Sequence, residues 1–267
     1  MSGIWPGDTK CVAMLSFDVD GVSGAINQKP ESASLPSFMS MREYGPAIAT
    51  SRILDLLDFH NIKGSFYIPG FVAETHIELV KDIHDRGHEV AHHGYMHEPP
   101  ATLTKQQEAD VLDRGSAILE GITGVKVAGY RSPSWELSED SLALLSERGF
   151  QYDSSMMGND IPYIVDADGK DMVEVPAHWE LDDVPYFNYS PALGMRNVAA
   201  SPEQVYQVWS AAFEGAHHYG RSFLLTMHPH CIGRPGRLRM LERLIEYIKG
   251  FDNVQFMRVD DVAKIFG

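Results

Sequence analysis

The sequence has little cysteine and little basic charge. Cys11 and Cys231 are the only cysteines in 267 residues, and no Cys-x-x-Cys pair occurs. Two isolated thiols exclude the disulfide framework of a small secreted domain and a cysteine-based zinc knuckle. With 22 Lys and Arg against 37 Asp and Glu, the formal net charge is −15. This acidic balance argues against nucleic acid and anionic membrane surfaces as natural partners, and it is typical of a soluble enzyme.

Long apolar runs and targeting signals are also missing. No stretch approaches the roughly 18 apolar residues that are needed to cross a bilayer. The first eight residues lack the basic and apolar regions of a secretory signal. We therefore expect a cytoplasmic protein with no membrane segment.

Strand and helix signals alternate along the whole chain, and no repeat, low-complexity run or flexible linker interrupts them. A hydrophobic content of 44% can bury a large core, so we predict one domain over residues 1–267. The alternation predicts an α/β fold with a mostly parallel sheet, and seven or eight such units favour a closed or nearly closed barrel. We expect strands near 11–18, 64–69, 88–92, 126–130, 150–153, 172–175, 222–227 and 253–257, with helices near 46–60, 74–86, 104–120, 138–148, 201–219 and 235–249.

One connection breaks this regular pattern. Segment 24–45 is polar, contains proline and serine, and is too long for an ordinary loop. We predict that it forms a lid over the functional site.

Two carboxylates lie at the end of the first predicted strand. Side chains alternate along a strand, so Asp18 and Asp20 point to one face while Val19 points into the core. Two carboxylates so close repel each other unless a cation or a shared proton relieves the repulsion. The pair therefore predicts a metal site or, as an alternative, a metal-free hydrolase in which the two groups share a proton.

Two histidines after another predicted strand offer the missing metal ligands. His93 and His97 are four residues apart and are expected to face one way on a helical turn. With one aspartate oxygen they form a set of two nitrogens and one carboxylate that leaves positions open for water and substrate. This set suits zinc, with cobalt, manganese, iron or nickel as alternatives. The remaining carboxylate is then available as a general base.

Other polar residues follow further strands, where barrel enzymes assemble their sites. Arg131 is expected to orient the base and hold it ionised. His228 or His230 is suited to donate a proton to a leaving amine, because histidine titrates near neutral pH. Asp153 is expected to fix the tautomer of that histidine and raise its pKa. Spacing alone does not choose between His228 and His230.

Five short motifs together resemble the polysaccharide deacetylase superfamily, carbohydrate esterase family four, over nearly the whole chain. They are Ser16-Phe-Asp18-Val-Asp20-Gly21, His93-Gly-Tyr-Met-His97, Gly129-Tyr-Arg131-Ser-Pro133-Ser-Trp135, Tyr152-Asp153 and Leu225-Thr-Met-His228. The resemblance implies a distorted (β/α) barrel and metal-dependent hydrolysis of a non-peptide C–N bond. It implies Asp18 as the base, Arg131 as its tether, His228 as the general acid and Asp153 as the support of that acid. The metal ligands that it implies are Asp20, His93 and His97.

Two departures from the family pattern bear on the substrate. Val19 separates the aspartates, and the second motif continues into Glu98 where sugar deacetylases more often have proline. Together with Gly-Arg-Pro at 233–235, these variants resemble the branch of intracellular peptidoglycan-deacetylase-like proteins, cyclic imide hydrolases and allantoinase relatives. The allantoinase relatives lack the second metal histidine, whereas this chain has it as His97. We therefore predict a small cyclic imide or ureide as substrate. The alternatives are an N-deacetylase of N-acetylglucosamine polymers or peptidoglycan, and a pseudoenzyme that binds carbohydrate without turnover.

The remaining expectations concern the surroundings of the site. Trp135, Trp179 and Tyr186 are expected to line a substrate pocket, although buried aromatic residues more often belong to the core. The possible supporting groups around the site are His92, Glu98, His178 and Cys231. Homo-oligomers occur among proteins of this kind, and we expect one here.

Overall fold

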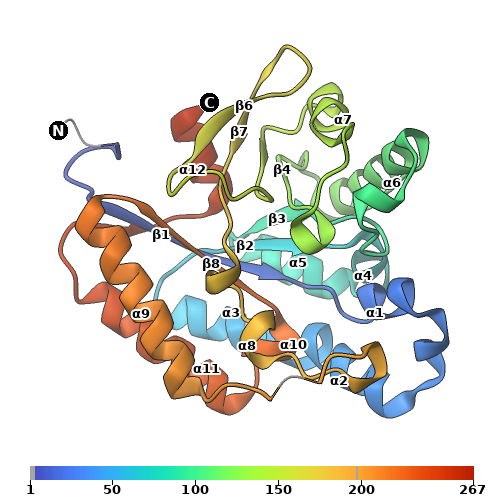
Figure 1. The fold of residues 1–267 in the computed structure, drawn as a ribbon, viewed down its shortest axis with the longest axis horizontal. Helices are drawn as coiled ribbons and strands as arrows, with labels where there is room; N and C mark the ends of the chain where they lie inside the picture. The colour runs from blue at the N-terminus through green and yellow to red at the C-terminus, as the bar shows by residue number, and fades with distance from the viewer. Residues whose placement is uncertain (1–3, 197) are drawn as a thin grey trace.

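The computed structural model of the protein describes residues 4–196 and 198–267 (Figure 1). Nine strands form one sheet in the order β6-β7-β5-β4-β3-β2-β1-β8, and β9 pairs with β1. In the part of the chain described, only the β6–β7 pairing is antiparallel. The strands are β1 (Cys11–Asp18), β2 (Ser65–Ile68), β3 (Glu89–His92), β4 (Gly129–Tyr130), β5 (Tyr152–Asp153), β6 (Tyr163–Asp166), β7 (Asp171–Glu174), β8 (Ser222–Met227) and β9 (Val254–Phe256).

The helices surround this sheet, and α9 lies beside α11 on its outer side (Figure 1). No helix of the described residues is long and apolar enough to cross a membrane. The α-helices are α1 (Ser23–Gln28), α2 (Pro36–Tyr44), α3 (Thr50–Phe59), α4 (Gly70–Thr75), α5 (Ile77–Asp85), α6 (Lys105–Thr123), α7 (Ser141–Arg148), α8 (Val184–Phe187), α9 (Pro202–Tyr219), α10 (Pro229–Ile232), α11 (Pro235–Lys249) and α12 (Val259–Phe266).

The predicted α/β fold with a mostly parallel sheet is confirmed. The sheet is curved but is not hydrogen-bonded continuously into a closed barrel: beyond β8 the contact is an isolated parallel bridge from Asp182 to Thr226. Strand β6 was not predicted from the sequence, whereas the other eight strands were. Its side chains alternate between half-buried and exposed, so it lacks the continuous apolar run that marks the central strands.

Strand β1 lies between β2 and β8 in the sheet, and all eight of its residues are buried. It pairs with β2, β8 and β9, and the Phe17 ring stacks on Phe66 with ring centroids 4.9 Å apart. A parallel strand covered on both faces needs such an apolar sequence. The burial holds the end of β1, which carries Asp18, rigidly in the middle of the molecule.

Segment 24–45 is helical instead of forming an open loop. It contains most of α1, the 3₁₀ turn η1 (Pro30–Ser34) and α2. The Ser32 hydroxyl donates to the Ala25 carbonyl at 3.1 Å, and the Tyr44 hydroxyl donates to the Gly233 carbonyl at 2.9 Å. These bonds fix the segment at the carboxyl edge of the sheet, beside the pocket described next.

Candidate active site

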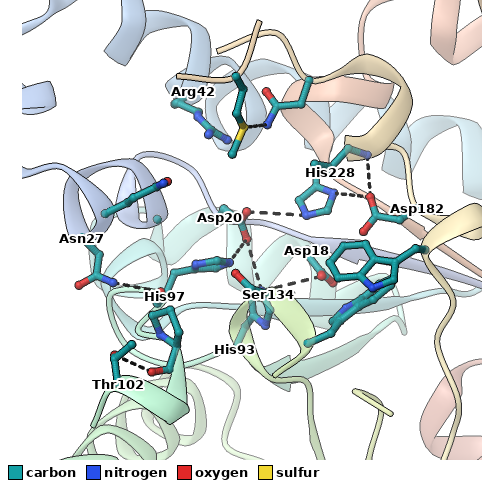
Figure 2. Close-up of a pocket in the computed structure, with 18 residues that line it drawn as sticks. Asp18, Asp20, Asn27, Arg42, His93, His97, Thr102, Ser134, Asp182 and His228 are labelled. Atoms are coloured by element: carbon teal, nitrogen blue, oxygen red, sulfur yellow. Dashed lines mark hydrogen bonds and ion pairs between the residues drawn. The ribbon is translucent and has the colours of Figure 1, made fainter. Parts of the chain in front are cut away.

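Two aspartates reach the site from the carboxyl end of β1. Asp18 ends the strand and Asp20 follows it; both line one pocket, whereas Val19 between them is fully buried in the core. This alternation confirms that the two carboxylates share a face. Figure 2 shows Asp18 and Asp20 converging with His93, His97 and His228.

Asp20, His93 and His97 form a cluster suited to a metal ion. The Asp20 Oδ1 lies 3.5 Å from the His93 Nε2 and 3.7 Å from the His97 Nε2, is buried, and has no hydrogen-bond partner. The His93 Nδ1 donates to the Arg131 carbonyl at 2.8 Å, which leaves Nε2 as a lone-pair donor facing the cluster. A carboxylate oxygen without a partner beside two imidazole nitrogens fits zinc or a similar divalent ion.

The ionisation of this cluster also suits a cation. Burial opposes the charge on Asp20, but His97, His93 and His228 hold the pKa of its carboxyl well below the ordinary value. Burial lowers the pKa of His97 to about 4. At neutral pH the cluster therefore presents an ionised carboxylate and an unprotonated His97, which are the forms that bind metal.

The two histidines converge through a bend, and the predicted helical turn is wrong. Gly94 and His97 have left-handed backbones, with φ of 74° and 60°. The Glu98 Oε2 accepts from the backbone N–H groups of Tyr95 and Met96 at 3.0 and 2.8 Å. This bend places the imidazole rings 4.9 Å apart between centroids. Glu98 therefore supports the histidines by ordering the backbone between them.

Arg131 is fully buried and is paired with Asp18. Its Nη1 donates to the Asp18 Oδ1 at 2.7 Å and to the Ser16 hydroxyl at 2.9 Å, and its Nε donates to the Ser154 carbonyl at 3.1 Å. Burial opposes the charge on Arg131, but Asp18 raises the pKa of the guanidinium. Arg131 thus lies where the sequence predicted, holding Asp18 in one orientation.

His228 is oriented by Asp183, a residue that the sequence analysis missed. The His228 Nδ1 lies 2.8 Å from the Asp183 Oδ1, and both carboxylate oxygens accept from the His228 backbone N–H at 3.1 and 3.0 Å. The His228 Nε2 faces the metal cluster, 3.8 Å from the Asp20 Oδ2. Burial opposes protonation of His228, but Asp182, Asp183 and Asp20 hold the pKa of its imidazole well above the ordinary value.

The prediction that Asp153 supports His228 is wrong. The Asp153 Oδ1 accepts from the Ser155 hydroxyl at 2.7 Å, and that hydroxyl accepts from the Ser132 N–H at 2.8 Å. Asp153 therefore orders the chain next to Arg131. The bridge from Asp182 to Thr226 brings the segment after β7 to the edge of β8, so the adjacent Asp183 occupies the position predicted for Asp153.

These groups line a pocket of about 580 Å³. Trp135 and Trp179 lie on its wall with ring centroids 4.4 Å apart, as predicted. Tyr186 is not among the lining residues: its hydroxyl donates to the Glu180 carbonyl at 3.0 Å, and its ring packs against Trp209. Tyr186 belongs to the contact between α8 and α9, so its predicted role in binding substrate is wrong.

Helices α1 and α2 contribute the opposite wall through Gly24, Asn27, Gln28 and Arg42. The Arg42 Nη1 lies 2.7 Å from the His230 Nε2. His230 thus contacts Arg42, whereas His228 contacts Asp183. The resemblance likewise assigned the role of general acid to His228 and not to His230. Nothing in the local sequence of Arg42 distinguishes it from a surface arginine, so its place in the pocket was not predicted. Asp183 carried one usable signal, an adjacent pair of acidic residues closely following a predicted strand.

Three other candidates have structural contacts outside the pocket lining. The His92 Nδ1 accepts from the Gly94 N–H at 3.1 Å, which stabilises the bend before His97. The His178 Nδ1 accepts from the Glu180 N–H at 3.2 Å within its own turn. Cys231 is buried, and burial raises the pKa of its thiol well above the ordinary value. An inert thiol is expected there.

Comparison with known proteins indicates the family of this chain. The profile of the polysaccharide deacetylase family matches residues 36–152. The chain is 32% identical to a peptidoglycan deacetylase of Helicobacter pylori over 93% of this chain and 94% of that protein. It is 28% identical to a peptidoglycan deacetylase-like protein of Gibberella zeae, over 95% of this chain and 85% of that protein.

Solved structures show the same fold. One from Mycobacterium smegmatis, described as a polysaccharide deacetylase, has a TM-score of 0.94 at 35% identity, covering 97% of this chain and 91% of that chain. The PuuE allantoinase structure has a TM-score of 0.85 at 23% identity, covering 98% of this chain and 91% of that chain, and so shares the fold. The chain belongs to the polysaccharide deacetylase family, whose members are hydrolases of the deacetylase type that act on amide C–N bonds.

Proposed function

We propose that the protein is a metal-dependent N-deacetylase of N-acetylated amino sugars, as free sugars or in peptidoglycan fragments. The observation that carries this proposal is one pocket holding an arginine-tethered carboxylate, a cluster suited to a metal ion and an aspartate-tethered histidine. These are the three groups that hydrolysis of an amide by activated water requires.

Asp18 is the proposed general base. Its Oδ1 is engaged by Arg131, and its Oδ2 lies 3.8 Å from the His93 Nε2, so the free oxygen faces the metal cluster. Arg131 holds Asp18 in an orientation in which its carboxylate can accept a proton from the attacking water. Because Arg131 is fully buried, the base has little freedom to turn away.

Asp20, His93 and His97 would hold the divalent ion. Bound there, zinc or a related ion supplies Lewis acidity toward the amide carbonyl and lowers the pKa of the attacking water.

His228 is the proposed general acid. With its Nδ1 proton held by Asp183, its Nε2 proton faces the cluster and is available to the leaving nitrogen. The neighbouring carboxylates favour the protonated imidazole, so the acid is charged before the amide binds. Base and acid thus occupy separate positions around the ion.

The acetylated-sugar substrate is supported by the names of the relatives, above all the peptidoglycan deacetylase of Helicobacter pylori. A cyclic imide or ureide is the second candidate. The observation in its favour is the wall formed by α1 and α2, which makes the site a pocket instead of an open groove. The pocket admits a short substrate more readily than a long polymer.

The test is hydrolysis by purified protein loaded with zinc or cobalt. Acetate release from N-acetylglucosamine oligomers and N-acetylmuramic acid supports the proposal, and ring opening of succinimide or hydantoin without acetate release supports the second candidate. Asp18→Asn should abolish either activity while retaining the metal. If the metal-loaded protein binds the sugars but hydrolyses neither the sugars nor the imides, it is a pseudoenzyme and both candidates are overturned.

The cytoplasmic location and the homo-oligomer remain predictions. Cell fractionation tests the first, and size-exclusion chromatography with light scattering tests the second.

A further inference from the structure

Arg42 is a buried cation in the pocket wall without a carboxylate partner in the described chain. It lies in α2, is 7% exposed, and lines the pocket. Its Nη1 contacts the His230 Nε2 at 2.7 Å, whereas its Nε is buried with no hydrogen-bond partner. Among the described residues no ion pair involves Arg42. In the view of Figure 2, Arg42 lies on the other side of Asp20 from His93.

The contact with His230 does not neutralise Arg42. Guanidinium nitrogens only donate hydrogen bonds, so the His230 Nε2 must accept and the imidazole must be neutral. Burial and the charge of Arg42 hold the pKa of His230 well below the ordinary value, which agrees with this assignment. His230 therefore satisfies one N–H group of Arg42 but supplies no negative charge. Burial lowers the pKa of Arg42 and the charge of Asp20 acts against that, but Asp20 makes no ion pair with Arg42 among the described residues.

Arg42 lacks the carboxylate partner that Arg131 has. Arg131 is also buried, but it has Asp18 at 2.7 Å and further bonds to serine oxygens. A buried charge without a partner destabilises a fold, and an apolar side chain at the same place would serve packing better. An unmatched arginine in a pocket wall is thus expected to pair with a ligand.

We propose that Arg42 binds a carboxylate of the substrate. A guanidinium matches a planar carboxylate through two parallel N–H···O bonds, and the bond to His230 occupies only one of the Arg42 N–H groups. Asp18, Asp20 and Asp182 also line the pocket, so a doubly charged anion would be repelled and a singly charged carboxylate is favoured.

The position of Arg42 also indicates which half of the substrate is acidic; this step rests on the proposed function. The His230 ring lies 5.9 Å from the His228 ring between centroids, and His228 is the proposed donor to the leaving nitrogen. Arg42 therefore lies on the side of the leaving amine. An amide whose amine half carries a carboxylate, such as an acidic N-acetylated amino sugar, fits this arrangement.

Binding measurements test the proposal without requiring turnover. N-acetylmuramic acid and N-acetylglucosamine differ by one lactyl carboxylate, and hydantoin-5-acetic acid differs from hydantoin by one acetate arm. Ligand binding to metal-loaded protein is followed by the fluorescence of Trp135 and Trp179, which line the pocket. The variants are Arg42→Gln and Arg42→Lys. The control is Arg148→Gln, because Arg148 is paired with Asp113 outside the pocket lining at 2.7 and 3.0 Å.

We expect the wild type to prefer the acidic member of at least one pair. Arg42→Gln should weaken binding of that acid by about 10–100-fold and leave the neutral compound unchanged. Arg42→Lys should retain part of the preference, Arg148→Gln all of it, and the melting temperature of Arg42→Gln should not fall. The proposal is overturned if the wild type shows no preference for acid, if Arg42→Gln weakens both members equally, or if that variant loses binding together with thermal stability. Because no hydrolysis is measured, failure of the proposed deacetylation gives a different result, namely binding without acetate release.

Discussion

Asp183→Asn is the substitution that most sharply tests the arrangement around the proposed acid. The carboxylate lies 2.8 Å from the His228 Nδ1 and is fully buried. A hydrogen bond to a charged group contributes about 1.5–3 kcal/mol. Asparagine keeps the shape and one acceptor but removes the negative charge. Since about 1.4 kcal/mol corresponds to one pKa unit, the pKa of His228 should fall by about one to two units.

The sign of the pH effect follows from the role of His228. A general acid must be protonated, so activity is lost as pH rises through its pKa. The carboxylates around His228 hold that pKa well above the ordinary value, with burial acting against them. In Asp183→Asn the alkaline limb of the rate profile should move to lower pH by about one to two units, so the loss of rate should be largest on the alkaline side and small where His228 stays protonated.

Asp153→Asn is the matched control, because sequence resemblance assigns the support of His228 to Asp153. In the structure Asp153 bonds to Ser155. Its replacement should leave the alkaline limb and the NMR titration of the His228 imidazole unchanged, whatever its effect on stability. The NMR titration requires no substrate, so it decides between the two aspartates even if the substrate assignment fails. The reasoning is refuted if Asp153→Asn shifts the titration and Asp183→Asn does not.

Three further predictions concern the metal cluster and the fold. His97→Ala should reduce the metal content from about one ion per chain to a small fraction, measured by elemental analysis after dialysis, because one of three ligands is lost. In Gly24→Ala the new methyl would lie 3.1 Å from the His97 Nδ1, so metal affinity should fall about 10-fold or more in a chelator competition, whereas Gly121→Ala, with open space around it, should not change it. Burial lowers the pKa of His88 to about 4, and its Nδ1 accepts from the Gly64 N–H. Its neutral form therefore stabilises the protein above pH about 6.5; urea unfolding of metal-free protein should show stability falling from there toward pH 4, less steeply in His88→Gln.

The parts of the site that the sequence predicted depend on short-range geometry. Asp18 and Asp20 share a face because strand side chains alternate, and this holds wherever the strand lies in the fold. The alternation of strands and helices likewise predicted the parallel sheet. His93 and His97 were found from their spacing, but the bend between them was not, because Gly94 and His97 adopt left-handed backbones that spacing does not reveal.

The parts that were missed depend on contacts between distant segments. Asp183 reaches His228, 45 residues further along the chain, only because the segment after β7 bridges to the edge of β8. Loop geometry of this kind is set by packing and has no periodicity to read. Tyr186 was predicted to line the pocket and does not. Its hydroxyl donates to the Glu180 carbonyl, outside the pocket lining.

The sequence predicted the position of Arg131 in the site but not that of Arg42. Arg131 follows a strand directly, so its position at the carboxyl edge was predictable, and Asp18 matches its charge. Arg42 lies on a helix within segment 24–45 and would be solvated if that segment were an open loop. Folding of α2 against His230 buries its guanidinium and leaves the charge without an acid partner in the described chain. In the proposed function the pairing of Arg131 with Asp18 orients the general base, whereas Arg42, which has no ion pair among the described residues, is the proposed site of substrate selection.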